Sequence, residues 1–283
     1  MADYSFQPNI DEGLNTMASS RLAGKGATPR YMETFKSYGW RILSLLIFFG
    51  VWEYAGRVPI SIAFPTFLDT MRALFAMIMN GSMIKAFFDT LQPLIIGVTL
   101  SAVFGVSCGV LMGLSKSFQW ACEPVFVVMQ AAPMAALIPL VTFVYGIGLA
   151  AKIASVVILA APIIVLNAFR AVRNANPSLI QMCKSFQGND FQAIIKVIIP
   201  DASPMIFAGL RLGVAGGFIG VILAELLITP TGIGDLITYH RSVAEYAEMY
   251  AAIFSILLFS AITITLLEAV EITIFRPEKK EIS

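Results

Sequence analysis

Charge is what this 283-residue chain has least of. Only 13% of its residues are Asp, Glu, Lys or Arg, 58% are hydrophobic, and the mean hydropathy is +0.80. This composition excludes an ordinary soluble protein and is typical of a membrane protein. The formal net charge of +1 gives no reason to expect nucleic acid as a partner.

Cysteine and histidine are also scarce. Cys108, Cys122 and Cys183 show no CxxC spacing, and His240 is the single histidine, so we expect neither a disulfide scaffold nor a metal site. The sequence has no GxxxxGK[ST] phosphate loop, so we do not expect this chain to hydrolyse ATP. An intramembrane enzyme is disfavoured because no Ser/His or paired-Asp constellation lies in the apolar segments.

Long apolar runs are abundant. About 20 apolar residues cross the hydrocarbon core, where charge is costly. Four runs contain no charged residue, and two further candidate spans are interrupted by charge, the first by Arg41 and Glu53 and the other by Arg211 and Glu225. The predicted spans lie at about 40–58, 90–115, 124–151, 153–169, 204–228 and 249–267. The sequence therefore predicts an all-α, polytopic membrane protein with six transmembrane helices within residues 39–276.

The distribution of basic residues predicts the orientation. The first 38 residues are polar, with no apolar h-region or cleavage site, so we expect no removable signal peptide. If both ends of the chain are inside, 13 of the 19 basic residues lie on the inner side and Arg211 lies within a span. The outer side then has only five basic residues, which agrees with the positive-inside rule: Arg57, Arg72, Lys85, Lys152 and Arg241. We expect cytoplasmic tails at 1–38 and 277–283, and a location in the cell inner membrane.

Small residues and prolines predict how the spans pack. Small residues recur every four positions in the second and fifth spans, which lets helices approach closely: Ser101, Gly105, Gly109 and Gly113, then Gly209, Gly213 and Gly217. Pro133, Pro139 and Pro162 remove intrahelical hydrogen bonds, so we expect kinks there, which line a pathway or only shape the packing.

The cytoplasmic segment 170–203 reads as two short amphipathic helices. Asn176 and Pro177 begin the first, Gly188 ends it, and Asn189 or Asp190 caps the second. Apolar residues recur at helical spacing in both: Leu179, Met182, Cys183 and Phe186, then Phe191, Ile194, Ile195 and Ile198 before Pro200. Neither helix is long enough to be stable alone. The loop therefore binds a partner, packs against its own spans, or lies at the lipid surface.

This loop resembles the connector of ATP-binding-cassette importer permeases. The family signature reads Glu-Ala-Ala, three residues, Gly, nine residues, Ile-x-Leu-Pro. Aligned on Pro200, the Glu-Ala-Ala positions hold Gln181, Met182 and Cys183, and Gln187 stands at the Gly position with Gly188 one step later. The tail matches better, because Val197, Ile199 and Pro200 take the Ile, Leu and Pro positions.

Fragments from about 90 to 271 resemble the nitrate/sulfonate/taurine class of these permeases in their shared order: Gly109-Val-Leu-Met-Gly-Leu-Ser115, Ala136-Leu-Ile-Pro-Leu140, Tyr145-Gly-Ile-Gly148, Ala151-Lys-Ile153, Gly209-Leu-Arg-Leu-Gly213, Gly220-Val-Ile-Leu-Ala-Glu225 and Gly232-Ile-Gly-Asp-Leu-Ile237. The resemblance implies a homodimeric pore, two cytosolic ATPase subunits that bind ATP and Mg²⁺, an external substrate-binding protein, and alternating access for a small anion. It also implies ATPase-coupling residues: Gln181, Met182, Cys183, Phe186, Gln187, Gly188, Asn189, Asp190, Phe191 and Pro200.

Charged and polar residues within the spans are candidates for the substrate pathway. Arg211 can attract an anion, snorkel to the cytosolic surface or brace the connector, whereas Glu225 would repel an anion and is expected to hydrogen-bond the outer loop. Uncharged candidates can bind substrate or join helices: Gln130, Thr142 and Asn167. The rival hypothesis is an ATP-independent secondary transporter, for which Arg211 and Glu225 would be the coupling-ion candidates.

Two short helices are expected on the outer side, near 67–79 and within 229–248. The second follows a Thr-Pro-Thr-Gly-Ile-Gly turn. We expect the second helix to lie at the membrane surface, where it can close the outer mouth of the pore or receive the binding protein. The helix near 67–79 can contact this partner too.

Overall fold

A computed structural model describes residues 30–58 and 63–275, and every regular element in these ranges is helical. The chain divides into two compact units, Met1–Val58 and Pro59–Ser283. In the first unit, helix α2 (Arg30–Arg57) contains the first predicted span, and Glu53 pairs with Arg57 at 2.8 Å near its end. The predicted tails fall largely outside the described residues, so the predicted division into tails and permease segment stays a prediction.

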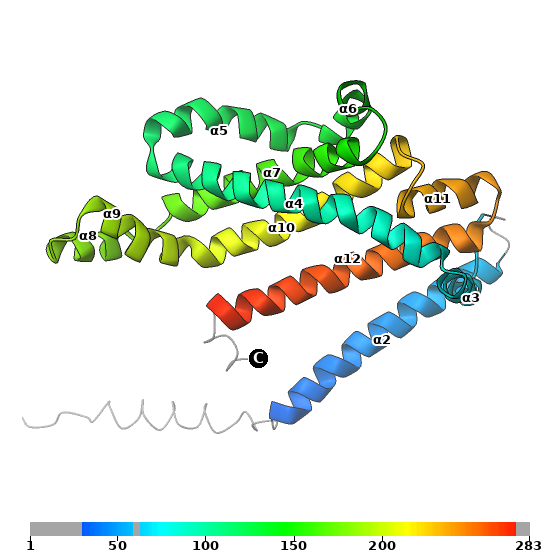
Figure 1. The fold of residues 1–283 in the computed structure, drawn as a ribbon. Helices are drawn as coiled ribbons and strands as arrows, with labels where there is room; N and C mark the ends of the chain where they lie inside the picture. Colours follow the sequence, from blue (N-terminus) through cyan, green and yellow to red (C-terminus); the bar gives the residue numbers. More distant parts are fainter. Residues whose placement is uncertain (1–29, 59–62, 276–283) are drawn as a thin grey trace, which may run out of the picture. The chain divides into compact units, whose positions relative to one another are not determined.

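The second unit begins with a short helix followed by a long one, and it ends with another long helix (Figure 1). Its elements are α3 (Phe67–Met79), α4 (Ser82–Leu114), α5 (Lys116–Ala131), η1 (Met134–Leu137), α6 (Ile138–Tyr145), α7 (Leu149–Arg173), α8 (Pro177–Ser185), α9 (Asp190–Ala193), the π-helical η2 (Ile194–Ile198), α10 (Ile199–Leu227), α11 (Ile233–Ser242) and α12 (Tyr246–Phe275). The two short helices predicted near 67–79 and within 229–248 are confirmed as α3 and α11, and their place on the outer side stays a prediction.

The all-α, polytopic class is confirmed, but the count of six spans is not. Within the described residues, four continuous helices are long and apolar enough to cross a membrane: Ser82–Leu114, Leu149–Arg173, Asp190–Leu227 and Tyr246–Thr273. Segments Lys116–Ala131 and Ala135–Tyr145 add a fifth if this pair, bent by 87°, counts as one span. Helix α2 is not among them, so a sixth span there stays a prediction.

Three predicted proline kinks have three different outcomes. Pro133 lies at the break between α5 and η1, where the chain bends, so that prediction is confirmed. Pro139 lies in the first turn of α6, where its missing N–H removes no helical bond, and the kink predicted there is wrong. Helix α7 runs from Leu149 to Arg173 through Pro162, so the chain stays helical there and the kink at Pro162 stays a prediction.

Helix α7 forms the centre of the bundle because small residues let α4 and α10 approach it closely. A Cβ added to Gly109 of α4 would lie 2.5 Å from the carbonyl oxygen of Val165. On the other side, a Cβ at Gly209 of α10 would lie 2.5 Å from the Cβ of Asn167. The predicted small-residue faces are therefore helix contacts, with backbone against backbone.

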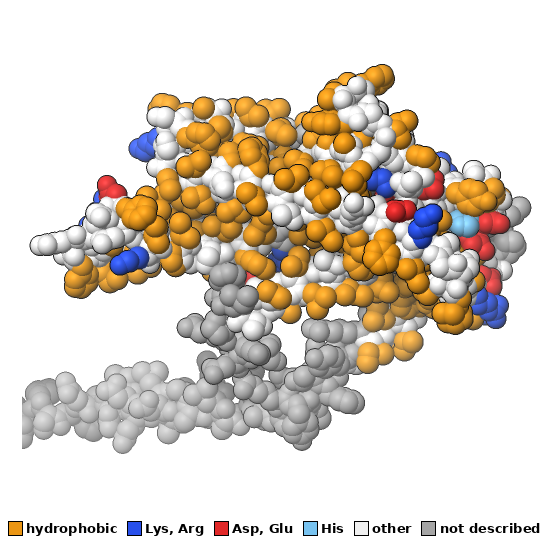
Figure 2. Space-filling model, viewed as in Figure 1, with side chains coloured by type: hydrophobic (Ala, Val, Ile, Leu, Met, Phe, Trp, Pro, Cys, Tyr) orange, Lys and Arg blue, Asp and Glu red, His pale blue; other side chains and the backbone are white. Residues whose placement is uncertain are grey.

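Charged and apolar side chains are segregated along the second unit. Figure 2 shows charged side chains mainly at its two ends, near α8 and α9 and near α11, with hydrophobic side chains over the middle. Large apolar residues in the middle of the helices are exposed, among them Phe104, Leu212 and Leu257. This surface is suited to contact with lipid acyl chains.

Replacing Gly109 by Val tests the close approach of α4 and α7. The added side chain meets backbone, which cannot rotate away, so we expect the free energy of unfolding to fall by about 1–3 kcal/mol or more. Thermal unfolding of the purified chain in detergent measures this loss. The matched control is Gly50→Val in α2, where a Cβ meets nothing within 4 Å. Equal melting temperatures for the two variants would contradict the close contact of α4 with α7 at Gly109.

Candidate functional site

A buried ion pair joins two spans at the end of the bundle near α11. The ammonium nitrogen of Lys152 in α7 lies 2.8 Å from Oε1 of Glu225 in α10, and the two side chains are 3% and 0% exposed. The expectation that Lys152 lies in an outer loop is therefore wrong, because α7 begins earlier than predicted and buries it. The expected hydrogen bond between Glu225 and the segment 229–248 is confirmed, because its Oε2 accepts the N–H of Gly234 at 3.0 Å.

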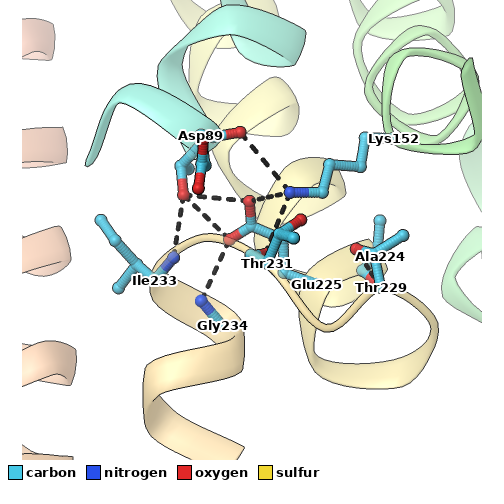
Figure 3. Close-up of polar contacts among 9 residues, drawn as sticks. Asp89, Lys152, Ala224, Glu225, Thr229, Thr231, Ile233 and Gly234 are labelled. Carbon is cyan, nitrogen blue, oxygen red and sulfur yellow. Dashed lines mark hydrogen bonds and ion pairs between the residues drawn. The ribbon is translucent and has the colours of Figure 1, made fainter. Parts of the chain in front are cut away.

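Lys152 has an acceptor for each of its three ammonium protons (Figure 3). Besides Glu225, these are the carbonyl oxygens of Thr231 at 3.0 Å and Asp89 at 3.5 Å. The Asp89 carbonyl is free for this role because its helical partner four residues on is Pro93, which has no N–H. A buried charge is tolerated when all its hydrogen bonds are made, and here they are.

Thr90 of α4 links Glu225 to the start of α11. Its hydroxyl lies 2.9 Å from both carboxylate oxygens of Glu225 and accepts the N–H of Ile233 at 3.0 Å. The turn before α11 needs glycine at Gly232, where φ is +92° and a Cβ would collide with the Glu225 carboxylate. We call Thr90, Lys152, Glu225 and the turn 229–234 the outer network.

Sequence reasoning singled out Glu225 but missed its partners. The signal for Lys152 was present, because this residue alone separates the uncharged runs 124–151 and 153–169 and therefore lies within apolar sequence. Thr90 offered no signal, since a threonine at the edge of an apolar run usually bonds its own helix.

Arg211 is the other charged pathway candidate, and it connects α10 to α12. Its Nη1 lies 3.0 Å from Oε2 of Glu268, and its Nε lies 3.8 Å from Oε2 of Glu271. Glu271 is only 5% exposed, and its Oε2 has no hydrogen-bond partner within the described residues. Arg211 therefore binds two carboxylates near the end of α12, and the ion pair braces these helices.

The three uncharged pathway candidates lie on three different helices. Gln130 of α5 is exposed and lines a cavity of about 260 Å³ bounded also by α7 and α10. Thr142 of α6 donates its hydroxyl proton to the carbonyl of Pro139, and Asn167 of α7 donates its side-chain N–H to the carbonyl of Ile163 at 2.7 Å. Of these, Gln130 alone lines the cavity. The assignment of all five residues to a substrate pathway stays a prediction.

The loop 170–203 forms an elbow at the other end of the second unit. The first predicted helix is confirmed as α8, capped by the side chain of Asn176, which accepts the N–H of Ser178 at 3.0 Å. Asn189 and Gln192 form a capping box at the start of α9. The second predicted helix does not end at Pro200, because α9 passes through the π-helical η2 directly into α10.

The turn between α8 and α9 is a Schellman motif with glutamine at its left-handed position. The N–H groups of Gln187 and Gly188 bond the carbonyls of Lys184 and Cys183, each at 3.0 Å. Gln187, not Gly188, has φ at +60°. Gly188 is needed for space instead, since a Cβ there would lie 2.5 Å from Sγ and 2.8 Å from the carbonyl oxygen of Cys183.

The predicted coupling residues lie together on this elbow. Phe186 is 81% exposed, Phe191 is 68% exposed and Met182 is 53% exposed. Most of the others are exposed as well: Gln181, Gln187, Asn189, Asp190 and Pro200, with Cys183 and Gly188 partly buried. The elbow therefore presents large apolar side chains outside the membrane-spanning part of α10.

Residues 101–274 match the family described as binding-protein-dependent transport system inner membrane component. The chain belongs to this family. It is 25% identical to the putative aliphatic sulfonates transport permease protein SsuC of Bacillus subtilis over 77% of this chain and 80% of that one. It is 28% identical to the nitrate import permease protein NrtB of Synechocystis over 60% and 64%. An inward-facing structure of the MetNI methionine ABC transporter has the same fold, with a TM-score of 0.58 and 18% identity over 70% of the permease and 97% of that chain.

The predicted resemblance to ATP-binding-cassette importer permeases is thus confirmed. The matched region of the permease includes the elbow, η2 and Glu225 in one segment. Its relatives are transport permeases, which argues against an enzyme and against the ATP-independent secondary transporter.

Removing one partner of the buried ion pair tests its role in the permease. Lys152→Met leaves the Glu225 carboxylate buried and unpaired, so we expect the free energy of unfolding to fall by about 3–5 kcal/mol. The double variant Lys152→Met/Glu225→Gln should lose clearly less than Lys152→Met alone. Thermal unfolding in detergent measures the stability of both variants. A double variant that is as unstable as Lys152→Met, or less stable, would contradict the pairing.

Replacing Gln187 by Gly tests the left-handed turn. Glycine adopts positive φ without the steric cost that a side chain brings, so the turn should become more stable by about 1 kcal/mol. The Gly188 amide, which bonds the Cys183 carbonyl, should then exchange with deuterium about fivefold more slowly. Unchanged or faster exchange would show that residue 187 does not take the left-handed position of this turn.

Proposed function

We propose that the permease forms the transmembrane pathway of an importer as one of two identical copies, with two cytosolic ATPase subunits bound to the elbows. The supporting observation is that Phe186, in the short helix pair of the elbow, is 81% exposed. Exposed aromatic residues of this kind are typical anchors of protein interfaces. Helix α8 has nine residues and no buried side chain, so it gains stability from such a partner.

ATP and Mg²⁺ would bind to the partner subunits. The chain lacks the phosphate loop that cradles a nucleotide, and it therefore contributes movement and not hydrolysis. Closure of the ATPases would push the elbow, and η2 would pass the push to α10 because the two are continuous. The spans then alternate between two packed states open to opposite sides.

A small anion is the proposed cargo, such as a sulfonate, nitrate or an aromatic acid, delivered by an external binding protein. Support comes from the relatives, whose names refer to aliphatic sulfonates and nitrate. Among the proposed pathway residues, Gln130 has the strongest support because it lines a cavity. Glu225 and Arg211 have weaker support, because each already has an ionic partner within the chain. Thr142 and Asn167 remain proposed pathway residues.

The proposed orientation places both termini and the elbow in the cytosol. The positive-inside rule supports it, since the elbow region contains Arg170, Arg173, Lys184 and Lys196. The burial of Lys152 strengthens this argument, because a lysine neutralised inside the bundle no longer counts as an outer-loop charge.

Replacing Gly188 by Val tests the elbow as the coupling element. The added side chain would collide with Cys183 and distort the turn that holds Phe186 and Phe191 in place. We expect normal membrane insertion but substrate uptake that no longer accompanies ATP hydrolysis. Uptake and hydrolysis are measured together in proteoliposomes containing the whole importer.

Gly50→Val is again the matched control, since it adds the same side chain at an open position of α2. Normal coupled uptake by Gly188→Val would count against the proposed coupling role. Failure of the unmodified permease to co-purify with an ATPase subunit, with uptake driven by an ion gradient alone, would overturn the proposed function as a whole.

A further inference from the structure

The first turn of α11 is bonded by side chains from two other helices. Its N-cap is Gly232, which has no side chain to accept the free N–H groups of a helix start. Thr90 of α4 accepts the N–H of Ile233, and Glu225 of α10 accepts the N–H of Gly234. All these groups are buried. Helix α11 is therefore attached to the bundle through buried polar bonds at its N-terminus.

Helix α10 connects this attachment to the elbow. It contains 29 residues, so it extends about 43 Å from Ile199 to Leu227. Near its start, Asp201 accepts the N–H of Asn176, the residue that caps α8, at 2.8 Å. The helix continues through Pro204, and the hydroxyl of Ser203 donates to the Pro200 carbonyl that Pro204 cannot bond. One unbroken helix thus has the elbow at one end and Glu225 at the other.

We propose that Thr90 and Glu225 are positioning residues that make α11 move with α10 and α4 as one body, so that a displacement at the elbow reaches the outer surface through α10. In this arrangement α11 is not a lid on its own hinge. Its exposed face, which includes Tyr239 at 57% exposure, shifts whenever α10 shifts. The inference rests on the proposed function, because it needs an ATPase at the elbow and a binding protein outside.

The buried position of the network supports a role in transmission. Salt and water weaken ion pairs between exposed groups. The side chains of Lys152 and Glu225 are only 3% and 0% exposed, so their ion pair is screened much less. Thr90 adds the link to α4, so α11 is tied to two helices that both pack on α7. A rigid connection of this kind is required if movement is to be passed on without loss.

Thr90→Val in the complete importer tests the proposal. Valine has nearly the same shape but neither donates to Glu225 nor accepts from Ile233, and the Lys152–Glu225 pair keeps its own contact. We expect the Ile233 and Gly234 amides to exchange with deuterium about tenfold faster. ATP hydrolysis without the binding protein should remain normal, whereas its stimulation by the substrate-loaded binding protein, and uptake with it, should fall about tenfold or more.

Two variants serve as controls. Thr90→Ser keeps the hydroxyl and should restore both stimulation and slow exchange. Thr238→Val removes a hydroxyl from α11 that bonds only its own helix, to the Gly234 carbonyl at 3.0 Å, and should behave like the unmodified importer. The unmodified importer must first show ATPase binding and stimulated hydrolysis, and their absence would contradict the proposed function and not this inference.

Several outcomes overturn the inference. Unchanged exchange in Thr90→Val would show that Thr90 does not hold α11. Faster exchange with normal stimulation and uptake would show that the attachment does not transmit movement. If Thr90→Val fails to assemble while Thr90→Ser assembles normally, Thr90 has a purely structural role. Loss of stimulation in Thr238→Val to the same degree would show that any disturbance of α11 has this effect.

Discussion

The buried pair of Lys152 and Glu225 is the interaction on which the α11 end of this permease depends. Two charges can remain in a low-dielectric interior only if each makes its full set of hydrogen bonds. That condition requires the Asp89 carbonyl left free by Pro93, the hydroxyl of Thr90, and the backbone of the turn 229–234. The ion pair therefore determines where α4, α7, α10 and α11 meet.

Close packing of α7 makes this precision possible. Glycines on α4 and α10 face α7, so backbones touch and the three helices form a rigid block. The break at Pro133 lies outside that block, next to the cavity that Gln130 lines. Rigid helices around one irregular segment are what a transporter needs, because a defined block can rock while a local pathway opens.

At the opposite end, the elbow combines stable caps with an exposed apolar surface. Asn176, Asn189 and Gln192 satisfy the free backbone groups of two very short helices, and the Schellman turn joins them. Phe186 and Phe191 then project from a structure that holds them in place. The π-helical η2 makes the elbow continuous with α10, so the two ends of the second unit share one helix.

The order of residues was enough to predict helices, four of the six proposed spans, caps and the family, because apolar runs, Asn-Pro starts and four-residue glycine spacing are local patterns with direct physical causes. It also located Glu225 and the elbow. It was not enough to predict that Lys152 pairs with Glu225, that Thr90 bridges to α11, or that Gln187 takes the left-handed position in place of Gly188. The first two contacts join residues far apart in the chain, and the packing of α7 against its neighbours brings these residues together. The position of Gln187 depends on the dihedral angles of one turn, which only the folded elbow determines.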